Sequence, residues 1–176
     1  MSAHWLRYTW DLGKLPEQPV TIASPLIVRQ ANREEESAVL TVISNAFSMD
    51  TGWADIHKSL LGKLQGQIST AFDEKEPACV VLQYGNRIIG CSVMRLSEEA
   101  EVNLITGPCV LHEYRSRGMG SSLLGASLAE LRKAGLRKAY GISREKTVAS
   151  RYLFPKFGGT AEPWQSELEA PPKIAA

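Results

Sequence analysis

The spacing of hydrophobic residues in the first part of the chain predicts one strand followed by two helices. The run "LIVR", residues 26–29, is typical of a short strand. Asn32 is a suitable N-cap for a helix over residues 33–47, because its side chain can accept from a free backbone N–H. Apolar residues recur at helical spacing in that helix and in a second one over residues 54–70.

Strands and helices alternate in the rest of the chain, giving the order β, α, α, β, β, β, α, β, α. This order predicts an α/β fold with a mixed sheet. In the sixth element Gly107-Pro108 should interrupt strand pairing, because proline has no N–H to donate. The tail after residue 159 has room for one strand. The pattern predicts strands over residues 78–84, 87–96, 102–111 and 136–142, and helices over residues 119–134 and 146–157.

The segment before the first regular strand has a pattern of its own. "HWLRYTW", residues 4–10, has the aromatic content of a strand, and "LPEQP" breaks it. We therefore divide the chain into a strand-like N-terminal extension, residues 1–25, and a single domain, residues 26–176. We expect the extension to cover an otherwise open sheet edge, within its own chain or across a homodimer.

Composition and charge narrow the function classes. Hydrophobic residues make up 44% and charged residues 22% of 176 residues, as in an ordinary globular domain. The net charge of +1 lacks the basic excess of proteins that bind nucleic acids or membrane surfaces. The chain shows no signal peptide and no window of membrane-span length, so we expect a cytoplasmic protein. Its three cysteines are odd in number and widely spaced, which predicts reduced core thiols and no metal site.

A glycine-rich stretch, "YRSRGMGSSLL", lies where a strand leads into a helix. The first N–H groups of a helix have no intrahelical partner, and the helix dipole makes that end positive. Glycine lets the backbone approach a bulky anion, so the stretch predicts a phosphate-binding loop. The alternative is a tight turn that needs glycine for its shape alone. Neither the dinucleotide fingerprint nor the Walker A loop fits, because Leu123 replaces the third glycine and no Gly-Lys-Ser/Thr follows.

The longer stretch "VLHEYRSRGMGSSLL" resembles the acyl-CoA signature of the GNAT superfamily of N-acetyltransferases, Arg/Gln-x-x-Gly-x-Gly/Ala. Arg115, Gly118 and Gly120 match its fixed positions, and the order of elements is similar from Leu26 to Gly158. The resemblance implies the acyl-CoA N-acyltransferase fold, a mixed, splayed, mostly antiparallel sheet flanked by helices. It also implies acetyl-CoA as co-substrate and direct transfer of acetyl to a primary amine.

The resemblance assigns roles around this stretch. The loop would hold the pyrophosphate of coenzyme A through backbone N–H groups, and the preceding strand would run beside the pantetheine. The Val110 N–H would face the thioester carbonyl and stabilise the oxyanion. The implied cofactor-binding residues are Pro108, Cys109, Val110, Arg115, Ser116, Arg117, Gly118, Met119, Gly120 and Ser121.

The sequence departs from the family at both acid–base positions. The family segment Leu-Tyr-x-x-x-Gly-Phe is "LFPKFGG" here, so Phe154 replaces the tyrosine that protonates the thiolate. Tyr152 is a candidate acid only if the helix is irregular near Pro155, because it lies on another side of a regular helix. Leu104 stands where some members carry a glutamate base. A water chain as base, and a thiolate that leaves unaided, are the alternatives.

The sequence does not identify the amine that accepts the acetyl group. Trp53 and His57, near the junction of the first two helices, are candidate substrate contacts. Their alternatives are a hydrophobic cap on the core and a solvated helix residue. The amine could belong to a polyamine-like molecule, an amino acid, a drug or a protein N-terminus. The alternative function is a non-catalytic acyl-CoA sensor or assembly module, which Phe154 and Leu104 favour; a nucleotide-binding protein is a third reading.

Overall fold

The computed structural model describes residues 4–16, 22–166 and 168. The chain forms seven strands and three α-helices in these ranges, with short 3-10 and π turns between them. The strands are β1 (Trp5–Asp11), β2 (Leu26–Gln30), β3 (Cys79–Tyr84), β4 (Arg87–Val93), β5 (Cys109–Val110), β6 (Lys138–Arg144) and β7 (Thr160–Trp164). The helices are α1 (Glu36–Ser48), α2 (His57–Asp73) and α3 (Met119–Lys133). The shorter turns are η1 (Leu12–Lys14), η2 (Arg33–Glu35), η3 (His112–Tyr114), η4 (Ala149–Leu153) and η5 (Lys156–Gly158).

The strands form two antiparallel sheets, ordered β2-β3-β4-β5 and β6-β1-β7. The two sheets meet at Leu104, which forms an antiparallel bridge to Met94 and a parallel bridge to Gly141. Beyond Leu104 the sheets diverge, because β5 pairs with β4 and not with β6. The predicted fold, a mixed, splayed and mostly antiparallel sheet flanked by helices, is confirmed.

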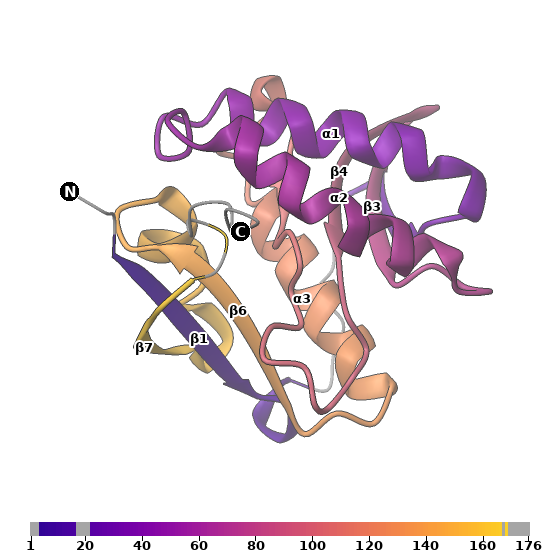
Figure 1. The fold of residues 1–176 in the computed structure, drawn as a ribbon. Coiled ribbons are helices and arrows are strands. Elements are labelled where there is room, and N and C mark those ends of the chain that lie inside the picture. The colour runs from indigo at the N-terminus through magenta and orange to yellow at the C-terminus, as the bar shows by residue number, and fades with distance from the viewer. Residues whose placement is uncertain (1–3, 17–21, 167, 169–176) are drawn as a thin grey trace, which may run out of the picture.

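Helices cover both faces of the first sheet. The Cys91 Sγ of β4 lies 4.0 Å from the Val39 carbonyl of α1, so that residue faces α1. A Cβ on the neighbouring Gly90 would lie 3.0 Å from the Leu123 side chain of α3. Because successive strand residues point to opposite faces, α1 and α3 pack on opposite sides of β4. Helix α3 also contacts β6, and Figure 1 shows it between the two groups of strands.

The N-terminal strand occupies the middle of the second sheet. Strand β1 forms where the sequence predicts it, and it pairs within its own chain. Trp5 pairs with Arg144 of β6 on one side and with Trp164 of β7 on the other. The prediction that this segment covers an open sheet edge is therefore wrong: β1 is the central strand of its sheet, and β7 is an edge strand.

Two predicted elements differ from the structure in regularity. The predicted strand over residues 102–111 is interrupted. It is bonded to its neighbours around Leu104 and again in β5, and between them Gly107 has a φ of +64° and Pro108 has no N–H. The predicted helix over residues 146–157 is replaced by a π-helix, η4, and a 3-10 turn, η5. The Phe154 N–H donates to the Ala149 carbonyl at 2.8 Å, the five-residue spacing of a π-turn.

The other elements follow the sequence closely. The tail contributes one strand, β7, as predicted, and Gly135 ends α3 with a φ of +98°. Helix α2 begins and ends three residues later than expected.

At the start of the α1 region the Glu35 carboxylate accepts from the Asn32 N–H at 2.8 Å and from Arg29 at 2.7 Å. The hydrogen bond from Arg29 holds the pKa of Glu35 below its ordinary value.

The cysteines are buried thiols. Cys79, Cys91 and Cys109 are all free, as the sequence predicts. Burial raises the pKa of Cys79 to about 12, and the pKa of Cys91 is raised by its contact with Cys109 and by burial. Across the described ranges no three His, Cys, Asp or Glu side chains come together as a metal site would require.

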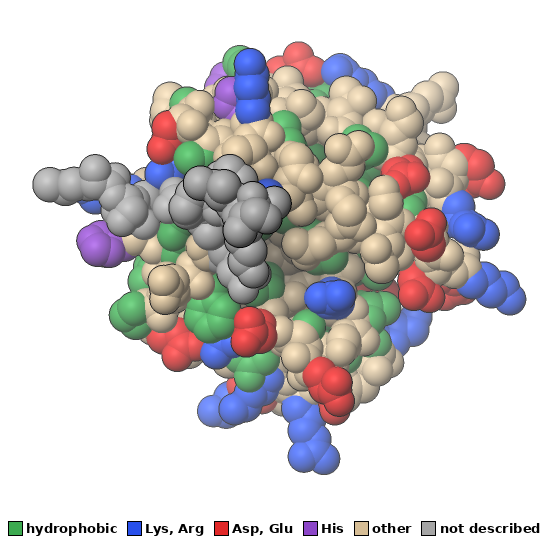
Figure 2. All heavy atoms as spheres, viewed as in Figure 1, with side chains coloured by type: hydrophobic (Ala, Val, Ile, Leu, Met, Phe, Trp, Pro, Cys, Tyr) green, Lys and Arg blue, Asp and Glu red, His purple; other side chains and the backbone are tan. Residues whose placement is uncertain are grey.

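The surface mixes both signs of charge. Figure 2 shows acidic and basic side chains interspersed over the face seen in Figure 1, consistent with a net charge of +1. None of the described helices has the length and hydropathy needed to span a bilayer.

Deleting residues 1–24 should destabilise the protein severely, because it removes the strand that joins β6 to β7. Trp10 is fully buried, and replacing a buried tryptophan by alanine costs about 3–5 kcal/mol of a total stability of about 5–15 kcal/mol. We expect aggregation or loss of the cooperative transition in thermal unfolding followed by circular dichroism and light scattering. An unchanged monomer with an unchanged Tm would contradict this. Lys14→Ala, at an exposed position after β1, is the control.

Candidate functional site

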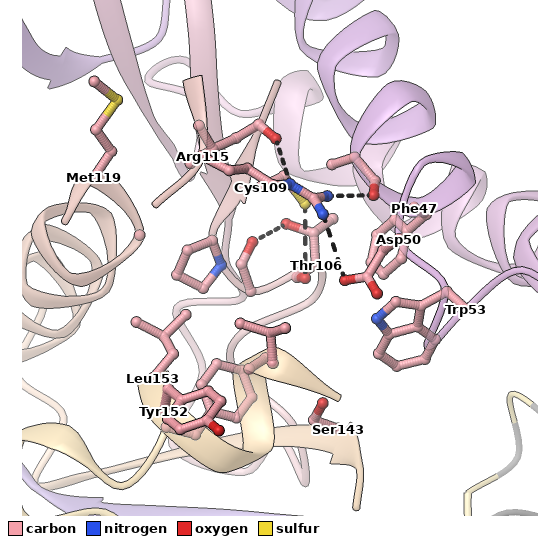
Figure 3. A pocket seen from close by; sticks show the side chains of 18 of the residues that line it. Phe47, Asp50, Trp53, Thr106, Cys109, Arg115, Met119, Ser143, Tyr152 and Leu153 are labelled. Carbon is pink, nitrogen blue, oxygen red and sulfur yellow. Dashed lines mark hydrogen bonds and ion pairs between the residues drawn. The ribbon is translucent and has the colours of Figure 1, made fainter. Parts of the chain in front are cut away.

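A cavity of about 690 Å³ lies where the two sheets diverge. Pro108, Cys109 and Val110 line it between the sheets, and the glycine-rich loop lines one end. Met119 and Leu153 lie at that end in Figure 3, and Asp50 and Trp53 lie at the other. All the site residues predicted from the sequence line this cavity except Arg117 and His57.

The loop before α3 has the backbone conformation of an anion-binding turn. Ser116 has a φ of +65° and Gly118 a φ of +77°, both in the left-handed region. Gly118 is the N-cap of α3 and supplies no side chain to cap it. The N–H groups of the first helical turn have no acceptor within the helix, and here no N-cap side chain accepts from them. The residues of this turn line the cavity. Together with the helix dipole they suit a phosphate group.

Arg115 is engaged inside the protein. Its Nη2 donates to the Ala46 carbonyl at the end of α1 at 2.6 Å, and its Nε donates to the Val110 carbonyl at 3.4 Å. Its Nη1 lies 3.8 Å from Asp50 Oδ2. This geometry favours a positioning role, tying the loop to α1 and β5, over the direct phosphate contact suggested by the sequence. Arg117 is exposed and outside the cavity wall.

Lys156 is a cation at the loop that sequence reasoning missed. Its Nζ donates to Ser121 Oγ at 2.7 Å, beside the first turn of α3. Its backbone carbonyl accepts from Trp10 Nε1 at 3.0 Å, which fixes the backbone of η5 against β1. Residues 121 and 156 come together only through the fold, so neither periodicity nor spacing could have paired them.

The Val110 N–H points away from its neighbouring strand. Leu111 donates to the Ile89 carbonyl at 2.9 Å, and Cys109 pairs with Cys91 in the register of β5 and β4. In an antiparallel pair, hydrogen-bonded and non-hydrogen-bonded residues alternate, so the N–H and carbonyl of Val110 both point away from β4. The Val110 carbonyl, on this side away from β4, accepts from Arg115 Nε. The N–H is therefore directed to the side on which the sheets separate.

Two aromatic residues in and just after η4 both line the cavity but differ in exposure. Phe154 is 3% exposed and packs edge to face on Tyr8 and Trp10, with ring centroids 5.4 and 5.5 Å away. The Tyr8 hydroxyl donates to the Ser150 carbonyl at 2.9 Å and so anchors η4 to β1. Tyr152 is 67% exposed and lines the cavity. Figure 3 shows its ring beside Leu153, across the cavity from Thr106.

The far end of the cavity has aromatic walls. Trp53 packs edge to face on Trp5 and Phe47, with ring centroids 5.5 and 5.2 Å away. All three rings line the cavity, so Trp53 lies where the sequence suggests. His57 does not line it; its Nδ1 is 3.1 Å from the Ala54 carbonyl at the start of α2.

An ion pair holds the turn between α1 and α2 against β6. The Arg144 guanidinium donates to both carboxylate oxygens of Asp55 at 2.7 and 3.0 Å, and to the Gly52 carbonyl at 2.9 Å. The hydrogen bond from Arg144 holds the pKa of Asp55 below its ordinary value. Because Trp53 lies between Gly52 and Asp55, these contacts fix the backbone on both sides of its ring.

Comparison with known proteins decides the family. The model of the acetyltransferase (GNAT) family matches residues 43–158, which include β5, the loop and η4. The chain belongs to the GNAT family. Among curated proteins none matches it by sequence.

Solved structures of GNAT proteins share the fold. A GCN5-related N-acetyltransferase from Sphaerobacter thermophilus has a TM-score of 0.63 at 14% identity, over 93% of this chain and 50% of that one. A GNAT-family acetyltransferase from Colwellia psychrerythraea has a TM-score of 0.63 at 16% identity, over 91% and 53%. One from Kribbella flavida has a TM-score of 0.59 at 13% identity, over 92% and 55%. This chain spans about half the length of these structures.

The glycine-rich loop predicts binding of acetyl-CoA, and if that prediction holds, Lys156→Ala should weaken the binding. A hydrogen bond to a charged group contributes about 1.5–3 kcal/mol when well formed, and the exposed position of Lys156 favours the lower figure. We expect the Kd for acetyl-CoA, measured by calorimetry, to rise about tenfold. Lys138→Ala, at an exposed position of β6 outside the cavity, is the matched control. Equal affinities in the two variants would show that Lys156 does not contact the cofactor.

Proposed function

We propose that this protein is an N-acetyltransferase that moves acetyl from acetyl-CoA to a primary amine by direct attack. The observation that carries the proposal is the Val110 N–H, turned away from β4 beside a cavity that runs to the glycine-rich loop. Family membership supports acetyl transfer in general. The acceptor and the acid–base groups are part of the proposal.

The residues around the loop suit coenzyme A. The first-turn N–H groups of α3 and the cation of Lys156 converge on one end of the cavity, where a pyrophosphate would be held. A Cβ at Gly118 would meet nothing within 4 Å, so the backbone there is open to approach. Pro108 and Cys109 continue along the wall, and the gap between β5 and β6 admits a narrow chain such as pantetheine.

Val110 would stabilise the charge that develops during transfer. Attack of the amine turns the thioester carbonyl into an oxyanion, and a fixed backbone donor stabilises it without reorganisation. Arg115 fixes that peptide by donating to the Val110 carbonyl, so the donor direction is set before substrate binds. The partial burial of Val110, 8% exposed, limits competition from water.

Tyr152 is the proposed acid for the departing thiolate. Phe154 holds the family position of the tyrosine, and it has no proton to give. The π-turn widens η4, and the Tyr152 ring lines the same cavity as Val110. A thiolate is a good leaving group, so this proton contributes less than it would for an alkoxide.

A second function is an acyl-CoA sensor or assembly module that binds without turnover. Phe154 and Leu104 favour it, because both positions that carry acid–base groups in the family are apolar and buried here, at 3% and 2% exposure. The aromatic end of the cavity favours the enzyme, since a binding module needs no acceptor site.

The first experiment is a calorimetric titration with acetyl-CoA, with ATP and NAD as controls. Micromolar binding of acetyl-CoA alone, followed by release of thiol on adding amines, would support the transferase. Tight binding with no thiol release under any amine would favour the sensor. Absence of acetyl-CoA binding would leave the glycines as a tight turn.

Tyr152→Phe should lower kcat about 10²-fold, the lower end of the range for general acid catalysis, with an unchanged KM for acetyl-CoA. The measurement is steady-state thiol release at saturating amine. Tyr84→Phe, at an exposed tyrosine of β3 outside the cavity, is the matched control. A variant with wild-type kcat would mean that the thiolate leaves unaided or takes its proton from water.

A further inference from the structure

The end of the cavity away from the phosphate loop is largely apolar. Trp5, Phe47 and Trp53 form its aromatic part, and Leu60 and Leu64 of α2 continue the wall. All five side chains are less than 9% exposed, so they are set in the core and not free to move aside. Walls of this kind bind a flat apolar group by burial and by edge-to-face contact.

One carboxylate faces this apolar region. Asp50 is the only acidic residue in the described wall of the cavity, and its side chain is 17% exposed. Its Oδ1 accepts from the Gly52 N–H at 2.9 Å, and its Oδ2 lies 3.8 Å from Arg115 Nη1. A carboxylate has about four acceptor sites, so Asp50 can accept from a further donor.

Asp50 also lies close to the proposed reaction centre. The same Arg115 guanidinium that lies beside Asp50 donates to the Val110 carbonyl. One guanidinium group therefore lies beside both Asp50 and the Val110 carbonyl. Figure 3 shows Asp50 next to Arg115 and Trp53, at the junction of the apolar end with the rest of the cavity.

The charges of the wall discriminate between acceptor classes. A polyamine carries several cations and would need several carboxylates, but the described wall offers one. An amino acid would need a cation for its own carboxylate, and Arg115 is already occupied by Ala46, Val110 and Asp50. Lys156 lies with Ser121 at the opposite, phosphate-binding end. The remaining acceptor class, an apolar molecule with a single cationic amine, fits a wall with one carboxylate and an apolar end.

We infer that the acceptor is a primary amine joined by a short chain to an aromatic ring, with Asp50 as the group that binds its ammonium and takes its proton. This inference rests on the proposed function and names its substrate class. The ring would pack against the cavity-facing side of Trp5, Phe47 and Trp53, and the amine would lie in the cavity beside Asp50, facing the thioester at Val110.

The proton and bond changes balance with the groups named. Asp50 accepts one proton from the ammonium, and the neutral nitrogen forms a bond to the thioester carbon. The Val110 N–H stabilises the oxyanion, the carbon–sulfur bond breaks, and the sulfur takes the electron pair. The second proton of the nitrogen is lost as the amide forms, and the thiolate gains one proton, so the products are amide, thiol and the proton held by Asp50.

The first test is a panel of amines with the full chain and saturating acetyl-CoA, followed by thiol release. We expect 2-phenylethylamine and tryptamine to have kcat/KM values at least tenfold above those of spermidine, glycine and trialanine. Preference for one of the last three would overturn the inference while the proposed function stands. If acetyl-CoA binds and no amine releases thiol, the transferase function itself fails and the inference fails with it.

The second test is Asp50→Asn, which keeps an oxygen for the Gly52 N–H and removes the charge. We expect kcat/KM for the preferred amine to fall about 10²-fold, and the activity to recover as pH rises and the amine loses its proton unaided. The KM for acetyl-CoA should stay within about twofold, because Arg115 keeps its carbonyl partners. A purely structural role would raise that KM and would not produce recovery at high pH.

Asp73→Asn is the charge-matched control for the second test. Asp73 is exposed at the end of α2 and does not line the cavity. It should have wild-type kinetics at every pH. Wild-type kinetics in Asp50→Asn as well would overturn the role of Asp50.

Discussion

The hydrogen bonding of β1 on both sides is the constraint on which the second sheet and much of the site depend. Strands β6 and β7 each pair with β1 and not with each other, so without β1 this sheet has no hydrogen-bonded strand pairs. Its side chains then hold the segment beyond β6: the Tyr8 hydroxyl binds the Ser150 carbonyl, and Trp10 binds the Lys156 carbonyl. Trp5 reaches the cavity itself. One strand thus supplies sheet continuity, the position of η4 and η5, and part of the cavity wall.

The divergence of the sheets at Leu104 accounts for a departure from the family. Leu104 bridges both sheets and is 2% exposed, so it is part of the core at the point where they meet. A carboxylate in such an apolar position would be costly unless paired. In the proposed mechanism, an acid–base group near the thioester therefore comes from another element. The turn after α1, which carries Asp50, η3, which carries His112, and η4, which carries Tyr152, all line the cavity.

The sequence was most informative where function depends on local backbone. Gly107-Pro108 predicted the interrupted strand, because glycine and proline have strong conformational preferences. The phosphate-binding role of the loop at Gly118 and Gly120 stays a prediction. Helix and strand positions followed from periodicity to within a few residues. The predicted last helix was wrong in kind, because periodicity does not distinguish a π-turn from an α-helix near Pro155.

Residues that act through tertiary contacts were out of reach of the sequence. Lys156 meets Ser121, and Asp50 meets Arg115, only because β1 and the two sheets bring distant segments together. Arg115 matched the family motif, yet its guanidinium binds Ala46 and Val110, a use that residue type and spacing could not reveal. Trp53 could be placed near the cavity because it lies between two predicted helices, whereas His57, four residues later, does not line the cavity.

The central place of β1 also sets an order for folding. The strands of sheet β2-β3-β4-β5 all lie before α3 in the sequence, so this sheet can form while the chain is still growing. Trp5, by contrast, pairs with Arg144 and Trp164, and closing so long a loop is slow. The strand made first is therefore among the last to be incorporated, and its three aromatic side chains stay exposed in the meantime. The nascent chain thus carries an aggregation-prone segment until β6 and β7 have been synthesised.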